Sequence, residues 1–448
     1  MTFLVPVMLF GWVPLAVLFF VRLQPHRAVL ATVIGGWLLL PMAGYDLPGF
    51  PEYSKGTAIS LGLILGGRLS GKRQAATFQW RIYDLPMILW CLCPIPSSLS
   101  NQLGWYNGLS GAFEQFITWG VPYMAGRMYF DTQEKLKDLC LGIVIGGLVY
   151  VPLCLWEFRM SPRLSINLYG FFPHEWRQHR RYGYWRPIVF MQHGLMVALW
   201  MATSATAAYW LWRDRVVKYL MGIPMPYIVT ALIATAVLCM SGNGWFTLGL
   251  GCAVYSINRR FSTNRPFLLL LLAIPLYIFL RVKGVVTGYD VEMAASFIFD
   301  AERVDSLGVR LFQEDLFIRQ ALENPLFGAG RASLAWPVNP VTGRLLIKMI
   351  DALWLINFSF RGAFGLITFV IAMLIGPWRV FRSTKQKVSE VHDNDIPIVV
   401  SLIVVMFMID SLFNAMINPV YIMCSGALVS TIATANRDVI PERVRCQK

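Results

Sequence analysis

Long apolar stretches alternate with short polar connections along the whole chain. A helix needs about 20 mostly apolar residues to cross a bilayer, and stretches approaching that length occur thirteen times. They lie near residues 1–21, 28–43, 56–68, 84–98, 108–126, 138–157, 191–212, 219–240, 243–258, 266–281, 353–377, 396–413 and 416–435. The pattern predicts an all-α polytopic membrane protein with about 12–13 transmembrane helices, in which residues 1–448 form a single integral membrane domain.

The amino-acid composition supports this class of protein. Of the 448 residues, 56% are hydrophobic and 14% are charged, whereas soluble domains carry about 25% charged residues. So little charge cannot cover the surface of a water-soluble protein, which excludes a soluble enzyme, a disordered chain and a disulfide scaffold. No lysine or arginine precedes the first apolar stretch, so we expect an uncleaved first span and not a secretory signal.

Lysine and arginine residues predict the orientation in the membrane. The connections after the odd-numbered spans are basic, and they hold 23 of the 39 lysine and arginine residues. Because short cytoplasmic loops carry the basic excess, the pattern predicts an external N-terminus and a cytoplasmic C-terminus. An odd number of spans agrees with this alternation.

Two long connections on the predicted external side, residues 158–190 and 281–352, hold another 14 basic residues. The orientation rule does not require charge there. In the first loop, arginines alternate with aromatic residues between Arg177 and Arg186. Either the guanidinium groups bind phosphate while aromatic faces pack on sugar, or the loop lies among lipid headgroups. Nucleic acid is disfavoured as a partner, because the loop faces away from the cytoplasm.

The second long loop is predicted to contain an amphipathic helix from Ser306 to Glu323. Ser306 suits the N-cap position, and Pro325 disfavours helix at the residue before it. The apolar residues expected on the membrane surface are Leu311, Phe312, Leu316, Ile318 and Leu322. Two charge pairs have the spacing of helix-surface ion pairs, Arg310 with Glu314 and Asp315 with Arg319. Alternatively, Arg310 meets an anionic lipid headgroup, and the spacing does not decide between the two.

Residues that bind metals are sparse. His174 and His179 lie in the first loop without a set of further ligands, the eight cysteines show no zinc spacing, and no Asp-x-Asp motif occurs in the two long external loops. We therefore expect no metal and no cofactor. His193 is expected to cap the seventh span rather than to act in catalysis.

Four stretches at the predicted outer face carry a further pattern. They are Arg310 with Glu323-Asn-Pro-Leu-Phe-Gly-Ala-Gly330, Asp351-Ala-Leu-Trp-Leu with Gly362-Ala-Phe-Gly365, Arg186-Pro-Ile-Val-Phe-Met-Gln-His-Gly194, and Ser241-Gly-Asn-Gly-Trp245. In their order and placement, these stretches resemble the O-antigen ligase and polymerase superfamily, which acts in bacterial envelope polysaccharide assembly.

The resemblance implies a GT-C-like fold and a metal-independent glycosyltransferase of the bacterial inner membrane. Such enzymes move a glycan from an undecaprenyl-pyrophosphate carrier to the hydroxyl of an acceptor glycan on the outer leaflet. A chain-length regulator and a flippase are implied partners. The resemblance also implies a pyrophosphate clamp of Arg186 and Arg310, with Arg180 or Arg181 as alternates. The implied sugar-binding residues are Trp185 and Trp354.

The resemblance implies a catalytic base at Asp351. Ligases of this superfamily have a histidine in that register, so the aspartate favours a polysaccharide polymerase over a ligase that transfers glycan to lipid A core. A carboxylate can accept the acceptor's proton when it is suitably tuned. Glu157, at the outer end of the sixth span, is a second candidate base, or it orients an arginine. A transporter or flippase and a non-catalytic export scaffold remain as alternatives, and neither depends on the outer arginines for chemistry.

Overall fold

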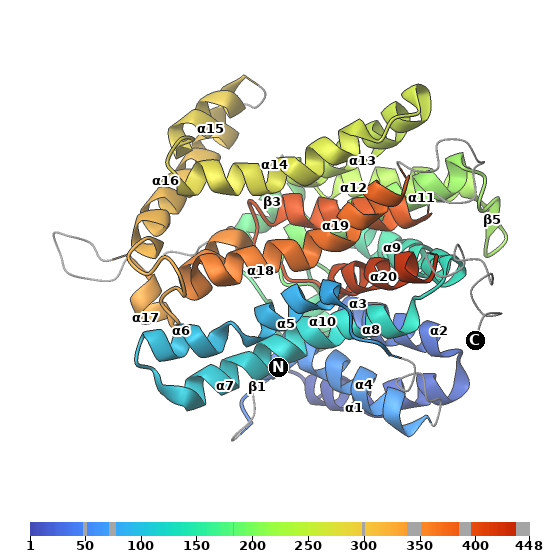
Figure 1. The fold of residues 1–448 in the computed structure, drawn as a ribbon. Helices are drawn as coiled ribbons and strands as arrows, with labels where there is room; N and C mark the ends of the chain where they lie inside the picture. The colour runs from blue at the N-terminus through green and yellow to red at the C-terminus, as the bar shows by residue number, and fades with distance from the viewer. Residues whose placement is uncertain are drawn as a thin grey trace, which may run out of the picture.

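The computed structural model describes residues 1–47, 52–70, 78–181, 183–297, 301–337, 351–384 and 396–435, and helices dominate it (Figure 1). The α-helices are α1 (Leu4–Arg22), α2 (Pro25–Leu30), α3 (Gly36–Leu39), α4 (Lys55–Leu69), α5 (Leu85–Leu92), α6 (Pro94–Ser100), α7 (Gly104–Gln115), α8 (Val121–Tyr129), α9 (Gln133–Met160), α10 (Leu164–Tyr169), α11 (Gly194–Arg213), α12 (Met225–Leu238), α13 (Gly242–Phe261), α14 (Arg265–Val282), α15 (Gly288–Ser296), α16 (Ala301–Ala321), α17 (Ala332–Ala335), α18 (Leu353–Thr384), α19 (Ile396–Asp410) and α20 (Pro419–Ala435).

Short π- and 3₁₀-helical turns and three small hairpins complete these elements. The turns are η1 (Ala31–Gly35), η3 (Ile82–Asp84), η4 (Phe116–Gly120) and η5 (Trp176–His179). The antiparallel hairpins pair β1 (Gly44–Tyr45) with β2 (Tyr53–Ser54), β3 (Arg180–Arg181) with β4 (Tyr184–Trp185), and β5 (Tyr219–Leu220) with β6 (Ile223–Pro224).

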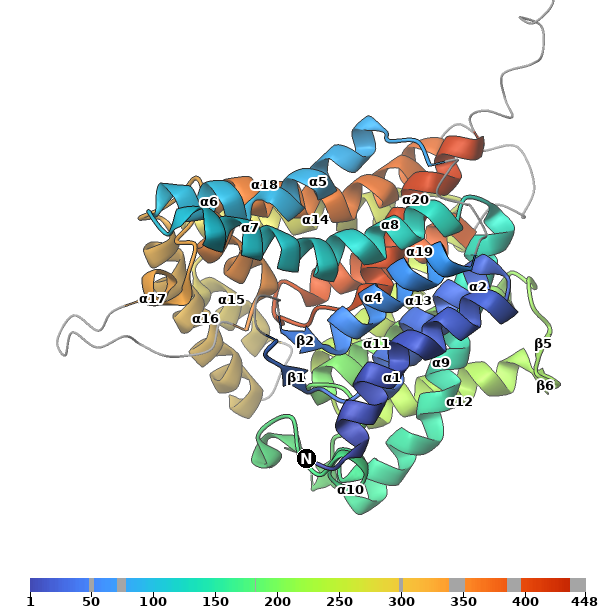
Figure 2. The same cartoon turned by 90° about the horizontal axis from the view of Figure 1, so that it is seen from below.

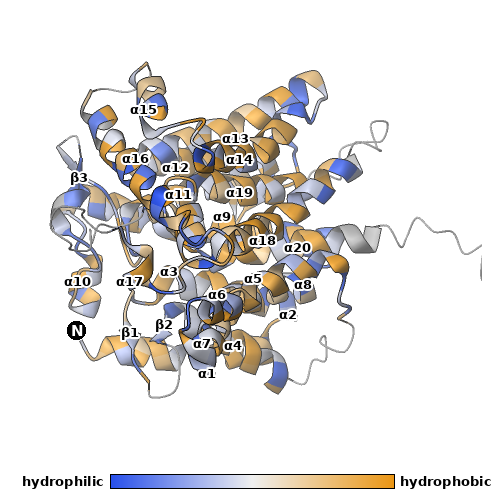
Figure 3. Ribbon diagram, turned by 60° about the vertical axis from the view of Figure 1, so that its left-hand side comes forward, coloured by the Kyte–Doolittle hydropathy of each residue, from blue (hydrophilic) through white to orange (hydrophobic). Residues whose placement is uncertain are grey.

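The all-α class is confirmed, because helical segments occupy each of the thirteen predicted stretches. Among the described residues, six helical stretches are long and apolar enough to cross a membrane, namely Leu4–Arg22, Ile82–Ser100, Gln133–Met160, Gly194–Arg213, Arg265–Val282 and Leu353–Ser383. Hydrophobic residues predominate along the helices of the bundle in Figure 3. The number of spans stays a prediction.

One predicted span begins later than expected. Residues 219–224 form the β5–β6 hairpin instead of the first turns of a helix. Gly222 adopts a φ of +79°, a conformation that suits a tight turn and not a helix. Pro224 is then the N-cap of α12, so the helix begins where the hairpin ends.

Helix α11 forms the centre of the bundle. Nearly all of its 20 residues are buried, and it packs against α9, α12, α13 and α19. Alanine, serine and threonine make up much of its middle section, and such small side chains let neighbouring helix backbones approach closely. The helix therefore provides a rigid support for the residues just before it, which belong to the first long loop.

The described ion pairs join residues that the orientation rule predicts on the same side of the membrane. At or beside the predicted cytoplasmic connections, the pairs are His26–Asp138, Arg27–Asp138, Arg127–Asp84, Lys135–Asp131 and Arg259–Asp214. In the predicted external loops, they are Arg281–Glu314, Arg281–Asp315 and Arg310–Asp351. The basic residues at 72–73, 385–387 and 437–448 lie outside the described residues. This segregation supports the predicted alternation, while the orientation in a cell stays a prediction.

The beginning of the chain lies beside the first long loop. The backbone N–H of Thr2 donates to the carbonyl of Tyr169 at 2.9 Å, and Figure 2 shows the N-terminus next to α10. In the same view α1 runs alongside α4, with which it packs. The N-terminus and the loop at 158–190 therefore share one end of the bundle, as the alternation of connections predicts.

Helix α18 is broken at Gly362, where φ is +62° and ψ is −165°. Backbone groups that the break leaves free form hydrogen bonds with the part of the second long loop that follows α16. The N–H groups of Ala363 and Phe364 donate to the carbonyls of Pro325 and Leu326, at 2.7 and 3.0 Å. In return, the N–H groups of Ala329 and Gly330 donate to the carbonyls of Ser359 and Phe360, at 2.8 and 3.1 Å. The Pro-Leu-Phe-Gly-Ala-Gly stretch thus supplies hydrogen-bond partners to the backbone groups at the break. Without partners, such groups would be highly unfavourable in a bilayer.

Replacing Gly362 by alanine should lower the free energy of unfolding by at least about 2 kcal/mol, because the backbone conformation there is nearly exclusive to glycine. A Cβ atom at Gly362 would also clash with the carbonyl group of Leu326. Denaturant unfolding in detergent measures the effect. Gly11→Ala in α1 is the matched control, because a Cβ there meets nothing within 4 Å. Equal stability of the two variants would contradict the role of the break.

Candidate functional site

Arg186 lies at the centre of the candidate site. It follows the β3–β4 hairpin, and its side chain is only 7% exposed. Its Nη2 atom donates to the carbonyl of Met240 at 2.7 Å, while its buried Nε atom has no hydrogen-bond partner among the residues that the structure describes. Met240 directly precedes Ser241, which caps α13 by accepting from the N–H of Gly244. Two of the four stretches that carry the family resemblance therefore meet at Arg186.

Two further predicted arginines surround Arg186. Burial lowers the pKa of Arg186 below its usual value, and the nearby charges of Arg181 and Arg310 lower the pKa further. Among the described residues, no carboxylate forms an ion pair with Arg186 or Arg181. Uncompensated positive charge in a buried setting is suited to an anionic ligand.

The fourth predicted arginine, Arg180, is exposed. Neighbouring residues of a strand point to opposite faces, so Arg180 and Arg181 of β3 face different ways. Arg180 and Arg181 were the two alternates for the pyrophosphate clamp, and of these only Arg181 has a charge that acts on Arg186. We call Arg181, Arg186 and Arg310 the arginine cluster.

Glu157 anchors the segment that carries Arg186. This side chain near the end of α9 is fully buried, and its carboxylate accepts three backbone N–H bonds. The donors are Leu164 at 3.0 Å, Ile188 at 2.8 Å and Val189 at 2.7 Å. Because an acceptor hydroxyl has no access to this carboxylate, a role as catalytic base is contradicted here. Glu157 instead positions the backbone that follows Arg186, so it acts on an arginine only indirectly.

Lys55 holds the same segment from the other side. Its Nζ atom donates to the carbonyl of Phe190 at 2.9 Å and lies 5.0 Å from the centre of the Trp37 ring. The lysine is 2% exposed. A buried lysine is costly unless it is bonded, so this contact fixes the backbone near Arg186 strongly. The sequence indicated no role for Lys55.

Arg310 comes from α16 and forms an ion pair with Asp351, with 3.1 Å between its Nε atom and the carboxylate. Both side chains remain more than a third exposed. The predicted pair of Arg310 with Glu314 is therefore wrong. Glu314 and Asp315 instead bond to the buried Arg281 of α14, at 3.0 and 2.8 Å. These contacts between distant parts of the chain replace the pairs that helix spacing predicted.

Helix α16 begins and packs differently from the prediction. It starts at Ala301, so Ser306 lies inside the helix and is not its N-cap. Leu311 and Ile318 are buried, because this side of the helix packs on the bundle. Phe312 and Leu322 are exposed and remain the residues available to a membrane surface. Figure 1 shows α15 and α16 projecting from one end of the bundle.

The two predicted sugar-binding tryptophans differ in accessibility. Trp185 of β4 is partly exposed and packs on Trp176, with 5.4 Å between ring centres. Trp354 is fully buried, and its indole N–H donates to the carbonyl of Leu412 at 3.2 Å. The assignment of Trp354 to sugar binding is therefore wrong, because the whole ring is used in helix packing.

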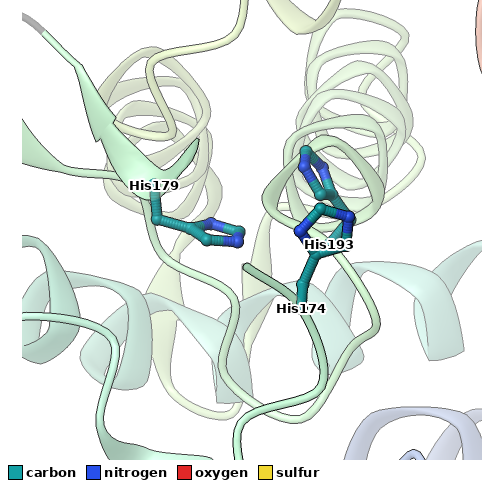
Figure 4. Close-up of side chains that lie close together, drawn as sticks. All are labelled: His174, His179 and His193. Carbon is teal, nitrogen blue, oxygen red and sulfur yellow. The ribbon is translucent and has the colours of Figure 1, made fainter. Parts of the chain in front are cut away.

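Three histidines gather next to the arginine cluster (Figure 4). One nitrogen atom from each of His174, His179 and His193 lies within 4.8 Å of the others. His179 is fully buried, and its pKa is lowered by burial and then by the charge of Arg186. His193 caps α11 by accepting from the N–H of Leu195 at 3.0 Å, as predicted.

The statement that His174 and His179 lack further ligands is therefore wrong. The loop folds back on the beginning of α11 and brings His193 beside them. The fourteen-residue separation between His179 and His193 is no recognised ligand spacing. Only the capping prediction for His193 could have drawn attention to this place.

No protein-family model matches the chain, and no curated protein matches it at a significant level. The fold and the site define a helical, apolar protein with an arginine cluster around the buried Arg186. The resemblance to the polysaccharide ligases and polymerases stays a prediction.

Proposed function

We propose that this protein is a polysaccharide polymerase that uses undecaprenyl-pyrophosphate-linked oligosaccharide donors at the outer face of the bacterial inner membrane. One observation carries the proposal: Arg186 is buried without a carboxylate partner in the described part of the chain, and Arg181 and Arg310 lie close to it. These charges stand at one end of a bundle of apolar helices. A lipid pyrophosphate presents its negative charge at this level of a bilayer.

The reaction requires charge stabilisation at the leaving group. The acceptor hydroxyl attacks the anomeric carbon of the donor glycan, and a new glycosidic bond forms. The bond from that carbon to the pyrophosphate oxygen breaks, and the electron pair leaves with the lipid pyrophosphate. The arginine cluster would stabilise the growing charge by preorganised, bidentate hydrogen bonds. No metal is needed for this step.

Asp351 would accept the proton of the acceptor hydroxyl. In the structure its carboxylate is paired with Arg310 at 3.1 Å. A pyrophosphate would compete for that arginine, because guanidinium groups bind phosphate strongly. Binding of the donor would then free the carboxylate to accept a hydrogen bond from the acceptor hydroxyl. The donor thus prepares the base for the acceptor, which favours an ordered reaction.

The test uses the purified protein in lipid nanodiscs with a synthetic undecaprenyl-pyrophosphate oligosaccharide, with and without EDTA. Gel analysis of the glycan should show a ladder of lengthened products under both conditions. Transfer to added lipid A core, without a ladder, would support a ligase instead. Movement of the intact donor across a liposome membrane without transfer would support a flippase. Absence of transfer from any lipid-linked donor would overturn the proposed chemistry.

A further inference from the structure

Buried histidine nitrogens without partners are the feature that the proposed chemistry leaves unexplained. Nδ1 of His174 and both ring nitrogens of His179 have no hydrogen-bond partner in the described part of the chain. Leaving a buried polar atom unpaired is unfavourable, because the hydrogen bonds it made to water are lost and not replaced. Three such atoms in one small group indicate a partner that the polypeptide itself does not supply.

The three rings are arranged around a common centre. Their ring centres are separated by 4.5 Å for His174 and His193, 5.1 Å for His179 and His193, and 5.7 Å for His174 and His179. Figure 4 shows His179 approaching from one side and the other two histidines from the opposite side. They come from the loop before η5, the end of η5, and the N-cap of α11.

We propose that His174, His179 and His193 together bind one divalent transition-metal ion of the zinc class. Three imidazoles are a recognised ligand set for zinc, with one position left for a water or an anion. Imidazole nitrogen also suits cobalt, nickel and copper, whereas magnesium and calcium prefer oxygen ligands. Ligand nitrogens in a tetrahedral zinc site lie about 3.3 Å apart, so the rings close inward slightly around the ion.

The cap at α11 sets the cost of binding. Because Nδ1 of His193 accepts from Leu195, the ring proton of the neutral side chain lies on Nε2. Binding the ion through Nε2 moves that proton to Nδ1 and gives up the bond from Leu195. Loss of a single helix cap is a modest cost in stability. Three metal–nitrogen bonds exceed this cost by far.

The neighbouring arginines shape the site further. The charges of Arg186 and Arg310 act on His193 and oppose a bare dication. An anion in the fourth coordination position, such as chloride or hydroxide, would offset part of this repulsion. The ion would hold the loop closed, since the carbonyl of His179 accepts from the N–H of Arg186 at 2.7 Å. Its role is structural, and it does not rest on the proposed transfer reaction. Because Glu157 and Lys55 also hold the segment after Arg186, the arginine would keep its place when EDTA removes the ion.

The test measures metal binding without any glycan substrate. Full-length protein without a polyhistidine tag is stripped with a chelator in detergent and titrated with Co²⁺, followed by its visible absorption and by elemental analysis. We expect about one ion per chain and a higher unfolding temperature, because an ion that binds only the folded state stabilises it.

Two ligand variants and one control make the test specific. His179→Gln removes the most buried ring, and His193→Asn removes a ligand while keeping a good N-cap. Both should weaken Co²⁺ binding by more than about tenfold, since even residues behind the ligands contribute tenfold or more. His26→Gln is the control, because His26 bonds to Asp138 at a different place. Unchanged binding in both ligand variants, or no bound ion in the unaltered protein, would overturn the proposal.

Discussion

Replacing Arg186 by alanine should reduce the rate of glycan extension about 10²–10³-fold, the usual effect of removing one preorganised donor from a developing anion. Arg186 is the most buried member of the arginine cluster, and its Nε atom is free to donate. Arg186→Lys should recover only part of the activity, because an ammonium group cannot form the bidentate contact. Quantifying the glycan ladder against time gives the rates.

Arg180→Ala is the matched control for this prediction. Arg180 lies in the same hairpin but is exposed, so its loss should change the rate less than about twofold, as is usual for exposed surface positions. The unfolding temperature of each variant shows whether the loop has kept its structure. A well-folded Arg186→Ala protein that extends glycan at the normal rate would remove the basis of the proposed function.

The second large effect is expected at the pair of Arg310 and Asp351. Asp351→Asn should lower kcat about 10²–10⁴-fold, because general base catalysis contributes that much, and should leave KM for the donor nearly unchanged. Arg310→Gln should lower kcat and also raise KM, since Arg310 is proposed to bind the pyrophosphate. Steady-state kinetics with the lipid-linked donor separates the two roles.

The double variant distinguishes a base from a residue that only positions Arg310. If Asp351 acts as a base, Asp351→Asn remains harmful in the Arg310→Gln protein. If it serves only to orient Arg310, the double variant should be no worse than Arg310→Gln alone, and this outcome would refute the proposed base. Arg319→Gln is the control, because Arg319 is an exposed arginine of the same helix.

Much of the local structure followed from the hydrophobic pattern. The helices at 133–160, 194–213 and 353–384 cover the predicted stretches, because a run of apolar residues has few other ways to satisfy its backbone in a membrane. The end of α16 before Asn324 was also predictable, since Pro325 acts on the residue next to it. The break at Gly362 was not predictable, because it depends on a loop that lies more than thirty residues earlier.

The site was predictable only in part. Residue type and the family resemblance indicated Arg186 and Arg310, and the structure brings their charges together. The same reasoning assigned Glu157 to catalysis, although it is fully buried and bonded to backbone. The sequence around an acidic residue near an arginine is the same whether its carboxylate faces solvent or lies beneath a folded loop. Burial decides its role, and burial depends on where residues 188–189 lie.

By itself, the sequence determined the helical class and the segregation of charge into two sets. Both follow from the solvent preference of each residue, which is a local property read along the chain. Only the tertiary structure decided which groups meet. Arg281 pairs with Glu314 and Asp315 of α16, Arg310 pairs with Asp351, and His193 joins two histidines of the first loop. These pairings depend on how helices far apart in the chain pack, because an ion pair or a ligand set forms only between groups that packing brings within a few ångströms.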